Sequence, residues 1–447
     1  MKGNYIGISY YFCDFYTSGG WGLNKKIKED IKKIVSSHPG EFLLILFAII
    51  LSYSSALDGG DFDVYLEAAY KLFHGQNPYL PPYAKDGMGY SYSPFFIILL
   101  IPFTSNYFLT EFVWCLLLCV MLYRSYVLFC HYLDEKLLEV KDKKLWIWLL
   151  LILSYQFVSN NIGMVQITIF LLWAILESLR LIKSNRAISG GLLLGAVINI
   201  KIMPVVMIGY LFYRGYFMAF TIAILTSVAL LFLPALFWGM EYNLTLLKDW
   251  WHIINPAHAE HQIDDGIGMH SMMSFLPVYL TETSGELPYP RNIFNFSIET
   301  AVLITRLSIV LLGLISLLYF RSKPFIKETN LIKTIWEISY FLLLIPLVMP
   351  HQQKYAFLFV IPMVAYVLYF FLITKAWHQG LSFKVVIAIF IIAMVVFSPV
   401  HGSDIIGRDA FRWSQHYRLI TISTLLLIPV SLYCHPSKLK HLMVSHL

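Results

Sequence analysis

Residues 355–374 read YAFLFVIPMVAYVLYFFLIT, a run of twenty residues without a charged side chain. A helix of about 20 apolar residues can cross the hydrocarbon core of a bilayer, which is about 30 Å thick. Comparable apolar runs recur from Phe42 to Tyr433, separated by polar stretches. This repetition predicts an all-α protein, a polytopic bundle of transmembrane helices.

The composition of the whole chain agrees with an integral membrane protein. Of its 447 residues, 58% are hydrophobic and only 13% are charged, whereas soluble domains carry about 25% charged residues. The net charge of +6 is scattered along the chain and predicts no nucleic-acid partner. The five cysteines lack the spacing of a disulfide framework or a metal site. We therefore expect membrane lipids to surround most of the chain.

The apolar runs define the expected domain organisation. We expect a cytoplasmic N-terminal segment over residues 1–41 with an amphipathic helix over 25–37, a transmembrane domain over 42–433, and a cytoplasmic tail over 434–447. About twelve membrane segments are predicted, over residues 42–57, 93–103, 108–130, 145–158, 164–182, 188–213, 216–238, 296–320, 334–349, 355–374, 385–398 and 417–433.

The charges of the polar stretches predict the orientation in the membrane. Residues 1–40 carry six lysines against three acids, and residues 321–333 carry four basic residues against one acid. Such positive segments stay in the cytoplasm. The acidic stretches 58–93 and 239–295 are therefore predicted to be large external loops. Both termini would be cytoplasmic, in a protein of the inner (plasma) membrane.

Three carboxylates occur within six residues in Leu57-Asp-Gly-Gly-Asp-Phe-Asp-Val-Tyr65, directly after the first apolar run. Like charges at close range disfavour ionisation, so Asp61 or Asp63 suits proton abstraction, and the pair could also receive a divalent cation. The alternative interpretation is a solvated loop that turns at Gly59 and Gly60. Asp61 and Asp63 are the candidate catalytic residues.

Three elements occur in a characteristic order: Asp-Phe-x-Val-Tyr at 61–65, Gly-x-Asn-Pro-Tyr at 75–79, and Tyr-x-Tyr-x-Pro-Phe at 90–95. This order resembles glycosyltransferase family 87, which belongs to the GT-C class of membrane glycosyltransferases. Looser similarities follow in the glycine-rich segment 190–204, which ends in Lys-x-x-Pro, and in segments 269–274 and 349–355.

The resemblance implies a GT-C bundle and a hexosyltransferase. The family includes polyprenol-phosphate-mannose-dependent mannosyltransferases, and its members use an acidic residue of the first external loop as catalytic base, here Asp61. It implies inverting transfer of a hexose, expected to be mannose, from polyprenyl phosphate to a lipid or glycan acceptor at the extracytoplasmic face. By motif position, substrate contacts are expected at Tyr65, Tyr92, Lys201, His270, His351 and Gln352.

A departing phosphate needs cations, which act more strongly where water is excluded. Lys201, His351 and Lys354 are the first candidates, and Arg408 is a further one. Lys201 could instead extend its ammonium group to the membrane interface, and residues 351–354 could form a plain hairpin loop. No metal ligands are predicted, because His258-Ala-Glu-His261 is not a His-Glu-x-x-His motif.

A transporter or flippase for a lipid-linked or anionic substrate is the alternative function. Such a protein would concentrate its polar residues near the middle of its helices. Here the polar candidates gather in external loops, which favours the enzyme. A noncatalytic scaffold would leave the clustered aspartates without a role.

Overall fold

The computed structural model describes residues 39–82, 89–133, 138–255 and 262–439. These residues form helices and turns, with no strand among them, which confirms the all-α prediction for this part of the chain. The chain divides into two units, Met1–Ile50 and Leu51–Leu447. Helix α2 (Pro39–Asp58) begins in the first unit and ends in the second. The amphipathic helix predicted over 25–37 and the segment 258–261 lie outside the described residues.

Six helical segments of the described chain are long and apolar enough to span a membrane, so we treat the protein as an integral membrane protein. Two bent helix pairs, α2 with α3 (Asp61–Phe73) and α19 (Arg408–His416) with α20 (Leu419–Tyr433), raise this number to eight if each pair is one span. The six are α5 (Tyr107–Tyr132), α6 (Val140–Gly163), α10 with α11 (Phe217–Leu231, Ala235–Trp238), α14 (Ile298–Phe320), α15 (Leu331–Val348), and η7 with α16 (Lys354–Val360, Ile361–Thr374).

The predicted count of twelve segments is therefore not confirmed, because several of the apolar runs form helices that are short or broken. The run 93–103 forms only α4 (Pro94–Leu100) and η3 (Ile101–Phe103), about 15 Å at 1.5 Å per helical residue. The run 188–213 is broken at Lys201. Its parts are α8 (Ala187–Ile200), η5 (Met203–Val205) and α9 (Val206–Tyr213).

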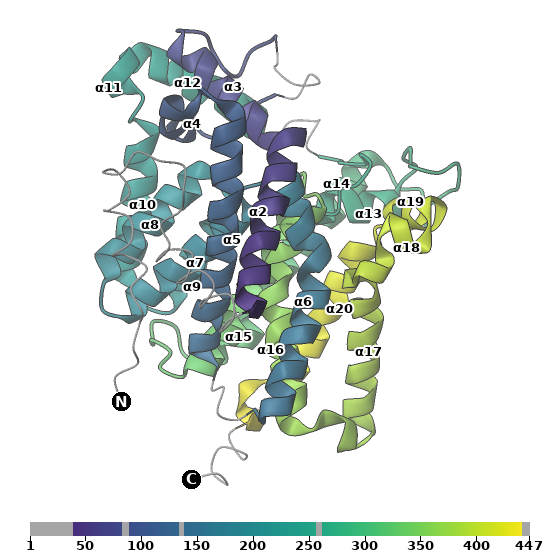
Figure 1. Cartoon of the computed structure of the whole chain (residues 1–447). Coiled ribbons are helices and arrows are strands. Elements are labelled where there is room, and N and C mark those ends of the chain that lie inside the picture. The colour runs from purple at the N-terminus through teal and green to yellow at the C-terminus, as the bar shows by residue number, and fades with distance from the viewer. Residues whose placement is uncertain (1–38, 83–88, 134–137, 256–261, 440–447) are drawn as a thin grey trace. The chain divides into compact units, whose positions relative to one another are not determined.

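Helices α15 and α16 form the centre of the bundle. In the apolar windows of α15 and of η7 with α16, 83% and 89% of the residues are buried, against 11% to 33% in the other four spans. The outer helices expose leucine, isoleucine and valine, as expected where lipid tails are the solvent. Figure 1 shows α16 running among the long helices α5, α6, α15 and α20.

The glycine-rich helix α8 packs closely against α10. An added Cβ at Gly191 would lie 2.8 Å from the backbone oxygen of Ala219, and one at Gly195 would lie 2.5 Å from that of Ala223. Small residues allow membrane helices to approach at backbone distance. This close packing holds the end of α8, and with it Lys201, in place.

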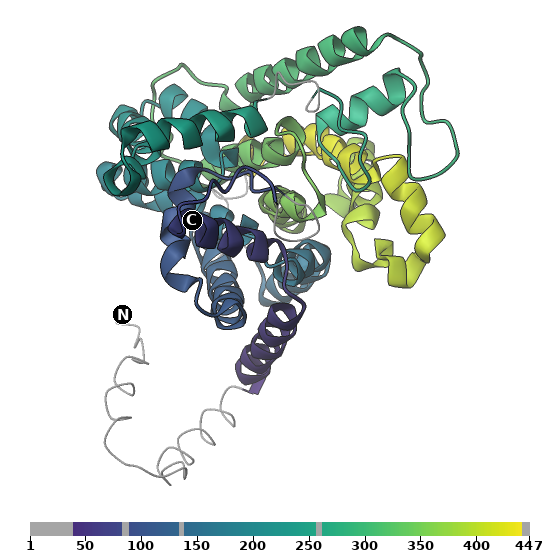
Figure 2. The same ribbon diagram turned by 90° about the horizontal axis from the view of Figure 1, so that it is seen from above.

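Short helices gather at one end of the long helices, where α3, α4 and α12 (Met240–Ile254) lie near one another (Figure 1). Figure 2 looks down on this end, and there α12 lies across the other helices. The remaining elements are α7 (Thr168–Lys183), α13 (Met272–Leu280), η8 (Ala376–His378), α17 (Leu381–Phe397), η9 (Pro399–His401), α18 (Ser403–Ile406) and η10 (Pro436–Leu439).

The opposite end of α15 carries a buried ionic network. Arg214 and Glu337, both almost fully buried, form an ion pair in which Arg214 Nε lies 3.0 Å from Glu337 Oε2. Lys333 Nζ lies 2.6 Å from Glu328 Oε2. Lys183 donates to the backbone oxygen of Glu328 at 2.9 Å. These contacts attach the basic loop 321–330 to the bundle about 27 Å from the other end of α15.

Candidate active site

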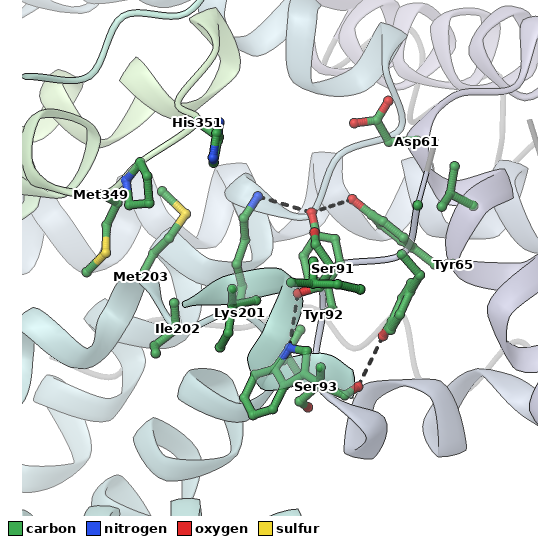
Figure 3. Close-up of a pocket in the computed structure, with 18 of the residues that line it drawn as sticks. Asp61, Tyr65, Ser91, Tyr92, Ser93, Lys201, Ile202, Met203, Met349 and His351 are labelled. Atoms are coloured by element: carbon green, nitrogen blue, oxygen red, sulfur yellow. Dashed lines mark hydrogen bonds between the residues drawn. The ribbon is translucent and has the colours of Figure 1, made fainter. Parts of the chain in front are cut away.

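A cavity of about 550 Å³ lies at the end of α15 that leads into residues 349–353. Its walls come from six separate stretches of sequence: α3, the segment 89–93, the break after α8, the end of α12, Met269, and the loop after α15. Six of the ten predicted site residues line it together, namely Asp61, Tyr65, Tyr92, Lys201, His351 and Gln352 (Figure 3).

Asp61 is the first residue of α3, where its carboxylate lies at the positive end of the helix dipole. Its backbone N–H donates to the backbone oxygen of Met164 at 3.0 Å. Gly60 permits this contact, because an added Cβ there would lie 2.4 Å from the same oxygen. Gln166 Nε2 donates a hydrogen bond to Asp61 Oδ2. Asp61 is therefore held through both its backbone and its side chain.

The residues that hold Asp61 come from the break between α6 and α7. Val165 adopts a positive φ of 47° there, an uncommon conformation for a β-branched residue. Asn161 Nδ2 donates to the backbone oxygen of Tyr355 at 2.9 Å and connects the same break to the central helix. Gln166 was missed as a site residue because 105 positions separate it from Asp61. The sequence signal for Gln166 was that, with Asn160 and Asn161, it resembles a Gly-Gln-x-Asn element of family 87 at a disturbed spacing.

Lys201 lies across the cavity from Asp61, in extended backbone between α8 and η5. Its Nζ donates to Tyr92 Oη at 3.1 Å, and Tyr92 Oη lies 2.6 Å from Tyr65 Oη. The ammonium group also lies 5.1 Å and 5.2 Å from the ring centroids of Tyr92 and Tyr355. Burial lowers the pKa of Lys201 to about 8, while nearby Asp61 acts in the opposite direction. Lys201 is thus a cation held in place at neutral pH.

His351 is the second basic group that lines the cavity. Its Nδ1 lies 3.0 Å from Oδ2 of the buried Asp264, which belongs to the acidic stretch 239–295. His351 has a positive φ of 54°, a conformation that costs free energy in a residue other than glycine. A carboxylate close to one ring nitrogen orients the imidazole ring. The structure thereby adds Asp264 to the site, a residue noticed in the sequence only as one acid among many.

The end of α12 supplies an apolar wall. Trp250, Trp251, Ile253 and Ile254 line the cavity, and Trp250 Nε1 donates to the backbone oxygen of Ser91 at 3.1 Å. That hydrogen bond attaches α12 to the segment that carries Tyr92. A cavity with polar groups at its centre and apolar residues on one side suits an amphipathic ligand.

Four predicted site residues are not among the described residues that line the cavity: Asp63, His270, Lys354 and Arg408. His270 is buried below it, where its backbone N–H donates to the Gln352 oxygen at 2.8 Å and its Nε2 lies 2.8 Å from Gln415 Oε1. Burial lowers the pKa of His270 to about 3, so its imidazole is neutral at physiological pH. Lys354 Nζ lies 5.7 Å from the ring centroid of Phe411. Arg408 is exposed at the start of α19.

No three side chains of His, Cys, Asp or Glu come together as metal ligands within the described part of the chain. Asp61 and Asp63 occupy the same helical turn, but their side chains serve different surroundings. Asp61 lines the cavity and accepts from Gln166, whereas Asp63 is not among the lining residues.

The sequence of this chain matches the family model of glycosyltransferase family 87 over residues 90–325, just over half of its length. The chain belongs to glycosyltransferase family 87. No curated protein and no solved structure matches it. Membership of family 87 establishes a membrane glycosyltransferase, which acts on a sugar donor and an acceptor.

The family 87 match contains much of the cavity wall but not all of it. The lining residues Tyr92, Lys201 and Trp250 fall within residues 90–325, whereas Asp61 precedes this range. Folding brings Asp61 to the matched segment through its contacts with Met164 and Gln166. The candidate base and the family-defining segment thus meet in one cavity.

Proposed function

We propose that this family 87 member transfers a hexose, mannose in our proposal, from polyprenyl phosphate to a lipid or glycan acceptor, with inversion at the anomeric carbon. The observation that carries this proposal is the cavity itself, in which a carboxylate faces two basic side chains across a space of about 550 Å³. An acidic group on one side suits an acceptor hydroxyl. Basic groups on the other side suit a phosphate.

In this proposal Asp61 is the general base. The acceptor oxygen attacks the anomeric carbon of the sugar and forms the new glycosidic bond, while its proton passes to the Asp61 carboxylate. The bond between the anomeric carbon and the phosphate oxygen breaks, and its electron pair leaves with polyprenyl phosphate. Attack from the face opposite the leaving group inverts the anomeric configuration.

Lys201 and His351 would stabilise the negative charge that develops on the departing phosphate. Both groups are held before substrate binds, Lys201 by Tyr92 and His351 by Asp264. Oriented charges in a site shielded from water lower the barrier more than mobile ones, since they need no reorganisation during the reaction. Lys354, which the sequence also suggested for this role, lies against Phe411 and is assigned no phosphate contact here.

The apolar wall formed by α12 would receive the first isoprene units of the donor or the lipid part of the acceptor. Trp251 is 56% exposed, so the wall continues from the cavity to the outside of the protein. We propose that this face is extracytoplasmic, because the acidic loops and the cavity share it while the basic loop 321–330 lies at the other end of α15.

The experiment that tests the proposal compares Asp61→Asn with Asp63→Asn, which removes an equal charge from the same helical turn. Purified protein is incubated with radiolabelled polyprenyl-phosphate mannose and a membrane lipid extract. We expect transfer by the parent and the Asp63 variant, and a loss of at least about 10²-fold in Asp61→Asn, since a general base contributes about 10²–10⁴-fold. Equal turnover in parent and Asp61→Asn would contradict the assignment of the base.

A transporter or flippase would give a different result in proteoliposomes. It would move the labelled polyprenyl-phosphate mannose across the bilayer without forming a glycosidic bond. The mass of this lipid would stay unchanged. A product whose mass has increased by one hexose supports the enzyme and identifies the acceptor.

A further inference from the structure

We infer that Gln166 is the positioning residue of the active site, which aims the Asp61 carboxylate into the cavity. This inference rests on the proposed function for its catalytic part, because it assigns the base to Asp61. The contact itself is a property of the fold. Gln166 Nε2 donates to Asp61 Oδ2, and the Gln166 side chain is fully buried.

The direction of this hydrogen bond is set by chemistry. An ionised carboxylate only accepts hydrogen bonds, so the amide nitrogen of Gln166, and not its oxygen, must face Asp61. Gln166 Oε1 is then left buried without a hydrogen-bond partner in the described structure. The amide nitrogen of Gln166 is thus committed to the carboxylate of Asp61.

Backbone hydrogen bonds hold the segment that carries Gln166 in place beside Asp61. Its backbone is fixed by the Gln166 N–H, which donates to the Asn161 oxygen at 2.8 Å. The adjacent Met164 oxygen accepts from the Asp61 N–H at 3.0 Å. One short stretch of chain therefore fixes both the Asp61 backbone and one carboxylate oxygen. Positioning of this kind raises the rate of a bound reactant more than it changes its affinity.

The activity test compares two buried glutamines with matched surroundings. Gln166→Leu removes the contact with Asp61. Gln156→Leu is the control, because Gln156 is also buried, donates from Nε2 to the Val396 oxygen at 2.8 Å, and has an unsatisfied Oε1. We expect Gln166→Leu to lower kcat at least about 10-fold with the KM for polyprenyl-phosphate mannose within twofold of the parent. We expect Gln156→Leu to keep the parental kcat.

A second test detects the contact between Gln166 and Asp61 through melting temperatures and requires no enzyme turnover. Gln166→Glu places two carboxylates in contact, whereas Asp61→Asn combined with Gln166→Glu restores an amide and a carboxylate in exchanged positions. We expect the melting temperature of the double variant to exceed the value that the two single changes predict together. The matched control combines Asp61→Asn with Asn161→Asp. Asn161 is a buried amide in the same segment, and its Nδ2 donates to the backbone oxygens of Phe157 and Tyr355. That pair should show additive changes.

The outcomes separate the inference from the function on which it rests. Additive melting temperatures for Asp61→Asn and Gln166→Glu would overturn the contact, whatever the activity. Coupled melting temperatures with a parental kcat in Gln166→Leu would show a structural contact and overturn the positioning role. Coupled melting temperatures with no transfer by the parent protein would overturn the proposed function, and the catalytic role of Gln166 with it, while the contact would stand.

Discussion

At the scale of single residues, the cavity separates groups of opposite charge and holds each of them in place. Asp61 is held by Gln166, Lys201 by Tyr92, and His351 by Asp264. Each holding residue lies far from its partner in sequence. The charges of the site thus keep their positions without a substrate, which is the condition for electrostatic stabilisation of a transition state.

The ionisation of Lys201 predicts a dependence of kcat/KM on pH. The pKa of Lys201 is lowered to about 8 by burial, so its ammonium form is lost as the pH rises through this value. Because kcat/KM reports the groups of the free enzyme, we expect it to fall above about pH 8. Lys201→Arg keeps its charge over the whole range and should remove this decline. Lys201→Met should lower kcat/KM by roughly 10-fold or more below about pH 8, and this difference from the parent should shrink as the pH rises above 8. An unchanged alkaline decline in Lys201→Arg would assign the titration to another group.

At the scale of elements, the site depends on where helices stop. Asp61 lies at the start of α3, Gln166 in the break between α6 and α7, and Lys201 between α8 and η5. Helix ends leave backbone groups without partners inside the helix. In this protein those ends supply the backbone contact between Asp61 and Met164. Breaks that reduce the number of complete spans are therefore the places where functional side chains reach the cavity.

The contact between α3 and the break after α6 predicts the effect of an added methyl group. In Gly60→Ala the new Cβ would lie 2.4 Å from the Met164 backbone oxygen, so the two segments must move apart. We expect a loss of about 1–3 kcal/mol in stability and a lower kcat, because Asp61 moves with its neighbour. Gly163→Ala is the control, since no atom lies within 4 Å of its added Cβ. Thermal unfolding in detergent and the transfer assay measure both effects. Equal behaviour of the two variants would contradict the close approach.

At the scale of the whole molecule, α15 connects two different polar environments. Its first turns carry Lys333 and Glu337 in the ionic network with Arg214, and its far end leads to His351 and the cavity. The two environments lie on opposite sides of the apolar length of the helix. The basic loop 321–330 and the candidate site should therefore face opposite sides of the membrane.

This arrangement predicts the labelling of introduced cysteines. Ser284 in the second acidic loop and Lys323 in the basic loop are both exposed, and the span α14 lies between them. In a cysteine-free background, a membrane-impermeant maleimide added to intact cells should label Ser284→Cys and leave Lys323→Cys unlabelled. After the membrane is permeabilised, both should react. Labelling of Lys323→Cys alone in intact cells would place the candidate site in the cytoplasm.

Some features of this protein can be predicted from patterns within single short stretches of its sequence. Long uncharged runs predict helices in lipid, because no other structure satisfies the backbone there. The motifs at 61–65 and 90–95 pointed to Asp61, Tyr65 and Tyr92, and the Lys-x-x-Pro end of the glycine-rich segment 190–204 pointed to Lys201. All four line the cavity. The family suggested by these motifs is confirmed by the match over residues 90–325.

Other features were decided only when distant segments packed together. Apolar length does not distinguish a full span from a short or broken helix, which is why twelve runs correspond to six to eight candidate spans. Likewise, nothing local shows that Gln166 reaches Asp61, that Asp264 holds His351, or that Lys354 lies against Phe411 instead of lining the cavity. These contacts join residues tens to more than a hundred positions apart. Hydrophobic pattern is a property of neighbours in sequence, whereas the direction of a side chain depends on the tertiary packing around it.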